Sequence, residues 1–571
     1  MRPHVVIVGA MVKRFAPALL LALAACTAPL PETDAVLYRT TAITLDAEQP
    51  IATGVVLDGD TIAAVGDFEA LRNRFPGAAE DESFADAVWL PGLIDPHVHM
   101  TLGAMMYGAE MVPPWDVPMA DGRVQGLRSR DALLGRIADI EAEAPDGPLV
   151  LWGYHDLVQG DVRRADLDAI SAERPVMLWH WSGHDFYLNS AAIEFLGLTP
   201  ALAERFHGVE LDDRGELTGR IYEDALLAIF PKLAAVLMSP EHIARGWTRY
   251  EALLADAGVT TVAEMGYGIF GRAAEDAFMA AHYGEDDSYR LFLVPEHRAW
   301  AREHGGGVVA AMAAAREADA RVLPQVKLFS DAAFYSQTMA LTAPGYVGGQ
   351  SEGQTVLFVT EPDDLPALMS QYWDAGLDIH IHSNGDAAQN STLAAMDTLA
   401  PAQDGQRVVL EHAALLSPDH IARLADHPAG VSAASHYVRY MGGMMREAIG
   451  DKADHLSPMR SAVDAGIPVT LHSDAPLAPP YPLLAAQAHL LRDTEDGSVR
   501  VPAERLSREQ ALRAVTLDAA WSLGLEAEIG SLEAGKRADI TIVDRNPLAT
   551  APEDWDDIAV LGRITGGRAS E

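Results

Sequence analysis

The sequence predicts an α/β protein whose main domain is a (β/α)8, TIM-like barrel. Three observations support this fold class. The chain contains eight strand-like apolar runs, most of them followed by an alanine-rich helical pattern. Short alternating strands flank this region at both ends, and a long segment separates the first run from the second. A repeat of strand then helix is typical of a parallel barrel, in which functional groups lie at the carboxyl ends of the strands.

The candidate barrel strands are short and rich in apolar residues, as expected for strands buried on both faces. They cover Val88–Ile94, Val259–Glu264, Arg290–Val294, Gln325–Phe329, Asp378–His382, Val408–Glu411, Gly430–Ala434 and Pro468–His472. The roughly 160 residues between the first two are too many for one crossover. They include strand-like runs of their own, Leu149–Trp152 and Val176–Trp181. We therefore expect an inserted subdomain over about residues 104–258 that covers the active site.

Both ends of the chain show a different pattern. Residues 35–75 alternate apolar and polar side chains and are interrupted by Gly-Asp turns, and Gly530–Leu548 follows the same pattern. Such alternation predicts short antiparallel strands.

The N-terminus has the features of an export signal. Lys13 and Arg14 precede an apolar run that is too short to span a bilayer, and the run ends in Leu-Ala-Ala-Cys at Cys26. These four residues resemble the bacterial lipoprotein box, which implies lipidation of Cys26. Thr27, rather than an Asp, follows the cysteine, and this favours attachment of the lipoprotein to the periplasmic face of the outer membrane. An ordinary secretory signal with a chance cysteine is the alternative, and translation can begin at Met1 or at Met11.

The net charge and the composition limit the kinds of molecule that this protein is expected to bind. The net charge of −40 over 571 residues disfavours nucleic acid and anionic lipid headgroups. A hydrophobic content of 49% and mixed charge indicate a globular protein, and the single cysteine excludes an internal disulfide. We expect a small-molecule substrate and membrane attachment only through a lipid on Cys26. A homodimer is left open.

Two histidines at the end of the first candidate strand point to a metal site. His97 and His99 are separated by one residue, so on an extended strand they project to the same side. Imidazole is a common ligand of zinc and of other transition metals. A surface strand end with two solvated histidines is the alternative.

The surrounding residues, Leu90 to His99, resemble the "PGxxDxHxH" signature of the amidohydrolase superfamily. Further motifs follow in the order typical of amidohydrolase family 3, which includes N-substituted formamide deformylases: Leu151–Leu157, Leu167–Ile193, Asp212–Glu223, Val326–Tyr346, Ile381–Ala388, Leu410–Leu416 and Leu471–Pro479. The resemblance covers nearly everything after about Asp34. It implies that the two chain ends pair into a small β-sandwich, with Ile540–Val543 near the N-terminal strands. The expected domains are a signal over 1–26, sandwich parts over 34–87 and 526–571, and a hydrolase barrel over 88–525.

The resemblance also implies the ligand set of one or two divalent metals, usually zinc: His97, His99, Lys327, His382, His412 and Asp474. Lys327 lies inside a central strand, where burial lowers the pKa of an amine and leaves it free to react with carbon dioxide. The resulting carboxylated lysine can bridge two metals, whereas an unmodified lysine that pairs with Asp331 or contacts substrate is the alternative. Asp474 is expected to be both ligand and catalytic proton carrier.

The remaining candidates lie beside substrate or behind the ligands. His184 is a candidate catalytic residue that reaches the substrate carbonyl from the insertion, with a structural histidine as the alternative. Adjacent residues in a regular strand face opposite sides, so only one of Glu411 and His412 can face inward. The resemblance assigns His412 to the metal and leaves Glu411 as its support. The other residues expected to line the site or support it are Glu264, His380, Asp386, His436 and Tyr346. His380 shares a face with His382 and is a second candidate ligand, and packing is the alternative for Glu264 and Tyr346, as it is for His472. Asp386 has a helix N-cap as its alternative role.

The sequence therefore predicts a metal-dependent amidohydrolase that cleaves a C–N bond in an amide, an N-formyl group or a cyclic amide. The attacking group would be a metal-activated water, with Asp474 as the proton shuttle. An esterase, lactonase or phosphoesterase on the same site is one alternative. A non-catalytic lipoprotein that binds a small molecule is another.

Overall fold

The computed structural model describes residues 35–144, 147–284, 287–349, 351–355, 357–403 and 405–570. The predicted signal segment and Cys26 lie outside these residues, so export and lipidation stay predictions. Within the described part of the chain, no helix combines the length and the apolar character needed to cross a bilayer.

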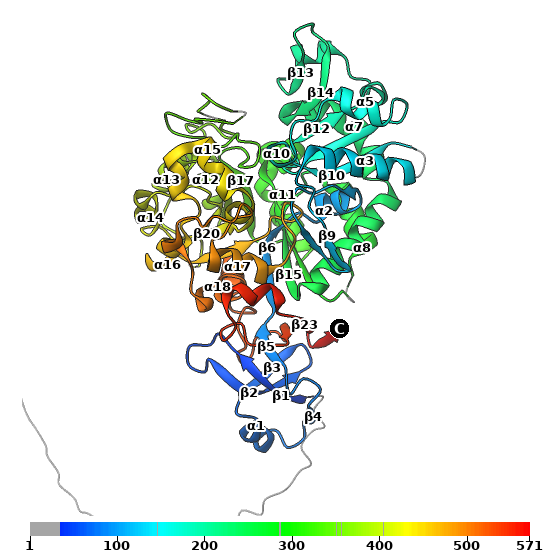
Figure 1. The fold of residues 1–571 in the computed structure, drawn as a ribbon. Coiled ribbons are helices and arrows are strands. Elements are labelled where there is room, and N and C mark those ends of the chain that lie inside the picture. The colour runs from blue at the N-terminus through cyan, green and yellow to red at the C-terminus, as the bar shows by residue number, and fades with distance from the viewer. Residues whose placement is uncertain are drawn as a thin grey trace, which may run out of the picture.

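Eight parallel strands form the centre of the molecule (Figure 1). Three belong to one sheet, in the order β16 (Arg290–Pro295), β15 (Val259–Tyr267) and β6 (Leu93–Val98). The other five lie in sequence order: β17 (Gln325–Phe329), β18 (Asp378–Ser383), β19 (Val408–His412), β20 (Ala429–Ala434) and β21 (Val469–His472). Parallel bridges join the two sheets at both edges, Glu296 with Lys327 and Val98 with Ala475. The arrangement is a TIM-barrel-like α/β fold.

Helices follow these strands and pack around them. They are α2 (Met100–Tyr107), α8 (Pro240–Asp256), α9 (Arg272–His282), α10 (His297–His304), α11 (Val308–Ala318), α12 (Leu365–Trp373), α13 (Asp386–Met396), α14 (Pro418–Leu424), α15 (Gly442–Ile449), α16 (Met459–Asp464), α17 (Pro482–Leu491), α18 (Arg508–Ala514) and α19 (Leu517–Ser522). One large apolar cluster includes side chains from the strands and from most of these helices. This packing fixes the positions of the strand ends, where the predicted ligands lie.

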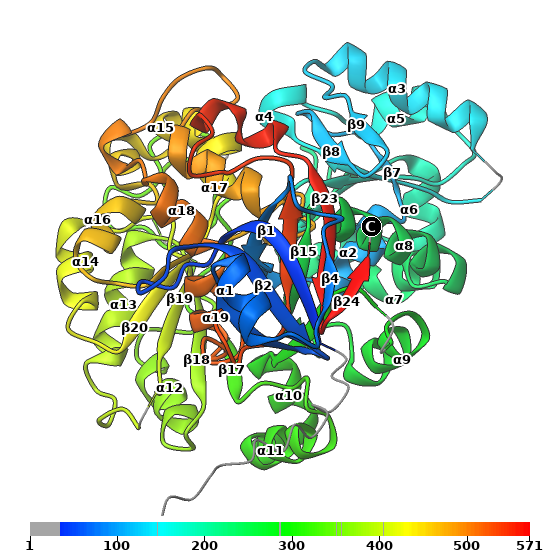
Figure 2. The ribbon, with the colours of Figure 1, turned by 90° about the horizontal axis from the view of Figure 1, so that it is seen from below.

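Strands from both ends of the chain share one sheet beside the barrel (Figure 2). Its members are β1 (Val36–Ile43), β2 (Ile51–Asp58), β3 (Thr61–Gly66), β4 (Ala79–Asp81), β5 (Val88–Pro91), β22 (Ile540–Val543), β23 (Val560–Thr565) and β24 (Arg568–Ser570). β5 pairs antiparallel with β22 and parallel with β1, and therefore joins the two ends. Trp89 is fully buried in the apolar cluster between them, and α1 (Phe68–Arg74) packs on the N-terminal strands. All these strands belong to one hydrogen-bonded sheet, whereas the expected β-sandwich would contain two sheets.

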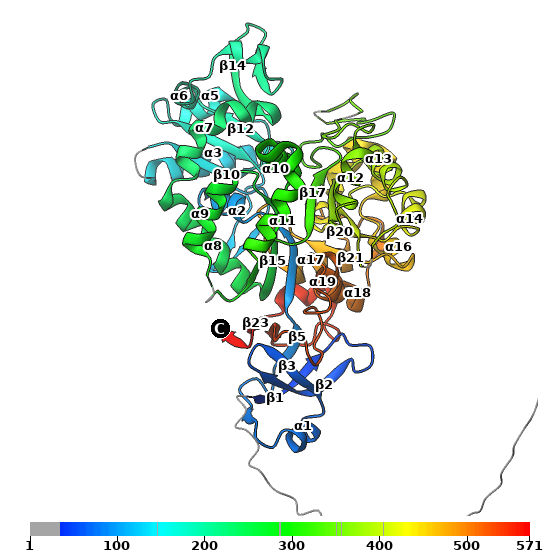
Figure 3. The same cartoon turned by 180° about the vertical axis from the view of Figure 1, so that it is seen from behind.

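The segment between β6 and β15 contains a six-stranded sheet, which lies at the opposite end of the molecule from the chain-end sheet (Figures 1 and 3). Its strands are β7 (Glu110–Met111), β10 (Leu149–Tyr154), β11 (Val176–His180), β12 (Asp185–Leu188), β13 (Val209–Leu211) and β14 (Leu217–Tyr222). A hairpin and five helices accompany it: β8 (Val117–Met119), β9 (Gly122–Val124), α3 (Arg130–Glu143), α4 (Asp156–Gln159), α5 (Arg164–Ile170), α6 (Ser190–Leu196) and α7 (Leu226–Leu237). The domain boundaries given above remain predictions.

The first predicted strand is wrong in its bounds, whereas the other seven agree with the structure to within three residues at each end. Val88–Ile94 is divided at Gly92 between β5 of the chain-end sheet and β6 of the barrel. A side chain at Gly92 would place its Cβ 2.1 Å from Thr260 Oγ1, so only glycine fits this crossing between sheets. Pro91-Gly92 marks this crossing in the sequence, but the apolar residues on both sides of it were predicted as one strand. His97 therefore lies within β6 rather than after it.

Candidate metal centre

The carboxyl ends of β6 and β21 bring two histidines onto one carboxylate. His97 Nε2 lies 3.4 Å from Asp474 Oδ1, and His99 Nε2 lies 3.3 Å from the same oxygen. Ligands about 2.0–2.1 Å from a tetrahedral zinc ion are separated by about 3.3 Å, so these separations suit a shared cation. One ligand atom from each of the three residues lies within 4.8 Å of the others. His97 is buried, and His99 keeps 18% of its side chain exposed.

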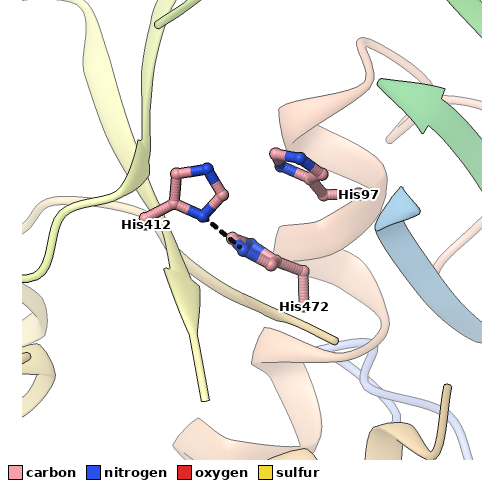
Figure 4. Close-up of side chains that lie close together, drawn as sticks. All are labelled: His97, His412 and His472. Carbon is pink, nitrogen blue, oxygen red and sulfur yellow. Dashed lines mark hydrogen bonds between the residues drawn. The ribbon is translucent and has the colours of Figure 1, made fainter. Parts of the chain in front are cut away.

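A second group of imidazoles shares His97. His97, His412 and His472 also place ligand atoms within 4.8 Å of one another, and Figure 4 shows the three rings together. His412 Nδ1 lies 3.1 Å from His472 Nε2 and 3.7 Å from Asp474 Oδ2. The two donor groups therefore overlap at His97, and His412 of the second group also lies close to Asp474 of the first.

Glu411 and His412 both face this centre, contrary to the prediction that only one can do so. His412 has a φ of 67°, in the left-handed region, and the next residue, Ala413, has a φ of 43°. The strand is therefore no longer regular at its end, and the alternation of side chains fails there. Asp474 has a φ of 56° and is also held in this uncommon conformation.

Glutamates behind the histidines set the direction of the rings. Glu411 contacts Nδ1 of both His97 and His380 at 2.6 Å. Glu264 lies 3.2 Å from His99 Nδ1 and accepts from the backbone N–H groups of Met100 and Gly266. These contacts leave Nε2 of His97 and His99 turned toward Asp474. A carboxylate on the second ring nitrogen is a common support for a metal-binding histidine.

Burial and mutual contacts shift the pKa values of the groups in this centre. Burial opposes ionisation of Glu411 and Asp474, but their contacts with the surrounding histidines hold both pKa values well below their usual range. Burial lowers the pKa of His97 and of His412 far below the usual value, so both rings are neutral at pH 7. For His99, burial opposes protonation, but Asp474 and Glu264 raise the pKa to about 9. A cation between His99 and Asp474 would replace that proton, since a ligand must be deprotonated.

Lys327 lies in β17, between β16 and β18, and is 1% exposed. Its Nζ is buried and makes no hydrogen bond to any described residue. Burial lowers its pKa to about 8, although Glu411 and Asp474 act in the opposite direction. This is the environment in which an amine is partly neutral and reactive.

His382 lies beside the two donor groups without belonging to either. Its ring centroid is 4.5 Å from that of His412, but its Nε2 lies 3.0 Å from Ala332 O and 2.9 Å from Asn384 Nδ2. Burial lowers its pKa to about 3, so the ring is neutral. Its neighbour at i−2, His380, is bonded to Glu411 instead.

The remaining candidate site residues fall into two groups, those beside the metal centre and those away from it. His184 approaches from the insertion, with Nδ1 3.2 Å from Glu223 and 44% of its side chain exposed, and it helps to lower the pKa of His382. His436 is buried and stacks on Tyr335 at 5.4 Å. Asp386 instead binds Lys452 and Thr342, and the Tyr346 hydroxyl donates to Met339 O. These last two residues support the loop after β17, and in the described part of the chain neither is hydrogen-bonded to a residue of the centre.

The sequence left His472 between pocket lining and packing, named Asp331 only as an alternative partner of Lys327, and gave Asp95 no role. His472 Nδ1 lies 2.7 Å from Ser432 Oγ, and its ring stacks on His97 at 4.5 Å. Asp95 accepts from the N–H and the hydroxyl of Ser473, next to Asp474. Asp331 accepts three backbone N–H groups from the loops after β17 and β18. The signal for His472 and Asp95 was their position at the end of a barrel strand, beside a predicted ligand.

The comparisons with known proteins agree with this geometry. The model of the amidohydrolase family matches residues 85–569. The chain belongs to the amidohydrolase family. It is 26% identical to the N-substituted formamide deformylase of Arthrobacter pascens over 549 residues, which cover 92% of this chain and 96% of that protein. It is 25% identical over 562 residues to the protein LONG AFTER FAR-RED 3 of Arabidopsis thaliana, covering 94% and 91%.

A solved structure supports the fold. The crystal structure of an uncharacterized metal-dependent hydrolase from Pyrococcus horikoshii aligns with a TM-score of 0.69 at 20% identity, covering 91% of this chain and 99% of that one. Family membership makes this chain a metal-dependent hydrolase, and the buried His and Asp groups described above are suited to a divalent cation.

Proposed function

We propose that this amidohydrolase cleaves a C–N bond in an amide, an N-formyl group or a cyclic amide, with Asp474 as the proton carrier. One observation carries the proposal. A single carboxylate oxygen, Asp474 Oδ1, lies within 3.4 Å of two histidine nitrogens held by glutamates. A carboxylate in that place can contact both a ligated cation and an attacking water.

The residues suited to hold the cation are His97, His99, His412, His472 and Asp474. His97, His412 and His472 supply neutral imidazoles, Asp474 supplies an ionised carboxylate, and His99 would release its proton to the solvent when a cation binds. A divalent cation there, of which zinc is the proposed identity, supplies Lewis acidity that favours deprotonation of water and polarises a carbonyl. We keep Lys327 as the proposed carboxylated ligand because its amine is buried and unpaired. We keep His382 as a proposed ligand because its neutral ring adjoins His412.

The protein's own groups account for the proton. Asp474 takes a proton from the attacking water and passes it to the leaving nitrogen, so the same carboxylate acts first as base and then as acid. Asp95 holds the neighbouring Ser473, and the contact of Asp474 N with His97 O fixes the backbone at 3.1 Å. His184 faces the substrate from the insertion, where its bond to Glu223 keeps it oriented.

Proteins that carry such a site also act on other bonds, so a substrate panel is the test. N-formyl amines, linear amides and cyclic amides should be turned over faster than matched esters, lactones and phosphodiesters. The Asp474→Asn variant should lose this turnover. A protein that binds zinc but favours esters or phosphodiesters would overturn the choice of bond. A protein that turns over none of the panel would support a binding lipoprotein instead.

A further inference from the structure

The insertion contains a second cluster of metal-type ligands that the proposed reaction does not use. His155 follows β10, Asp156 begins α4, and His180 ends β11. One ligand atom from each lies within 4.8 Å of the others. β10 and β11 are parallel neighbours, with Tyr154 paired to His180, so the sheet itself brings the three residues together.

The spacing repeats that of the strand-end centre. His180 Nε2 lies 3.2 Å from Asp156 Oδ1, and His155 Nδ1 lies 3.5 Å from the same oxygen. These values match the separation of about 3.3 Å between two ligands of a tetrahedral zinc ion. As at Asp474, a single carboxylate oxygen lies against two imidazoles.

His155 provides an independent observation. Its side chain is fully buried, its Nδ1 lies 3.5 Å from Asp156 Oδ1, and its Nε2 has no hydrogen-bond partner among the described residues. Buried polar groups are normally paired, and one that is not calls for a bound ion, a water or another explanation. Asp156 keeps 23% of its side chain exposed, which gives a cation a route to the cluster.

We propose that His155, Asp156 and His180 form a second site for a divalent transition-metal cation, separate from the strand-end centre. Two imidazoles and one carboxylate suit zinc, cobalt or iron(II) rather than calcium or magnesium. The site ties the ends of β10 and β11 together. His155 packs against Trp115 at 5.6 Å and Tyr335 at 6.3 Å, so the cation also orders the side chains between the insertion and the loop after β17.

Binding at His180 has a structural consequence. Its Nδ1 lies 2.9 Å from Ser182 Oγ and receives the Ser182 N–H at 3.1 Å. A cation on Nε2 requires the ring proton on Nδ1, where it is donated to Ser182 Oγ, as is common for metal-binding histidines. The contact with the Ser182 N–H must then lengthen.

Metal counting separates this site from the strand-end centre. The full chain is stripped with a chelator, reloaded with Zn²⁺ and analysed by inductively coupled plasma mass spectrometry. Asp156→Asn and His180→Gln should each lose one equivalent relative to wild type, whereas His97→Ala should lose zinc from the strand ends only. His207→Gln is the matched control, because His207 lies 3.6 Å from Asp224 with no second histidine in the cluster. It should retain the wild-type content.

Diffraction from the wild-type protein avoids the risk that a variant misfolds. A crystal loaded with Zn²⁺ should show anomalous density between His155, Asp156 and His180 in addition to density at the strand ends. Absence of the first peak, with wild-type zinc content in Asp156→Asn, would leave a hydrogen-bonded triad and overturn the proposal. Absence of the strand-end peak would instead count against the proposed function.

Discussion

Lys327 should destabilise the metal-free protein, and Lys327→Met should therefore stabilise it. Burial lowers the pKa of this amine from 10.5 to about 8. At pH 7 the ammonium must be held in a site that disfavours it, and the difference between the two pKa values corresponds to roughly 3 kcal/mol. Methionine has nearly the same length and no charge, so it removes this cost while filling the space.

The predicted stabilisation by Lys327→Met depends on pH. Between about pH 8 and pH 10.5 the unfolded chain binds the proton that the folded chain releases, so wild-type stability relative to Lys327→Met rises with pH in this window. The stabilisation by methionine should be full at pH 7 and should vanish above pH 10.5. Urea denaturation of metal-free, bicarbonate-depleted protein, followed by circular dichroism, measures both values.

Lys452→Met is the matched control with the opposite sign. Lys452 binds Asp386 and Thr342, so its loss leaves a partly buried carboxylate without its partner and should destabilise the protein. An equal or lower stability of Lys327→Met than of wild type at pH 7 would refute the account of Lys327. Lys327→Met should also lose catalysis when zinc is restored, because methionine cannot form the proposed carboxylated ligand.

Three further changes test the centre. Glu411→Gln should weaken zinc affinity by about 10–100-fold in a chelator competition, because an amide cannot accept from both His97 and His380. Glu275→Gln is the control. Glu275 is a buried glutamate that accepts from the backbone N–H groups of Gly268 and Phe270, so this variant should leave zinc affinity unchanged. Asp474→Asn should lower kcat by at least about 100-fold while zinc content stays within the wild-type range, and near-normal turnover would remove Asp474 from the mechanism. Removal of zinc should lower Tm, and stoichiometric zinc should restore it; a Tm insensitive to zinc would exclude a cation that binds the folded state preferentially.

The barrel strands could be predicted because their apolar runs end at polar residues, which lie at the carboxyl ends of the strands where the candidate site residues are found. Gln325–Phe329 agrees with β17 at both ends, since Pro324 and Ser330 flank a run that only a buried strand accommodates. The first strand failed for a different reason. Pro91-Gly92 is the only local signal of the passage from one sheet to the next, and the contact that explains it, Gly92 against Thr260, is made across the sheet.

The centre could be predicted to the extent that its ligands lie at or just beyond the carboxyl end of a strand. His97 lies near the end of β6, His99 and Asp474 lie just beyond β6 and β21, and the three meet. His412 and Glu411 did not, because alternation assumes a regular backbone and the φ of 67° at His412 removes that assumption. The cluster in the insertion was hidden for a third reason: His155 and His180 lie on separate strands, and only the pairing of β10 with β11 brings them together.

Several unfavourable features gather at the strand-end centre, which is itself an argument for catalysis. His412 and Asp474 hold left-handed backbone conformations that cost of order 1–3 kcal/mol each. Lys327 adds a buried amine, and His97 and His412 are imidazoles packed where they cannot be protonated. A protein that only needed to fold would replace such groups with apolar side chains. A cation resolves the conflict, because it needs neutral imidazoles and an ionised carboxylate at the positions that the strained strand ends provide. If the Asp474→Asn and Lys327→Met variants bind zinc as well as wild type and still turn over substrate, that reasoning fails.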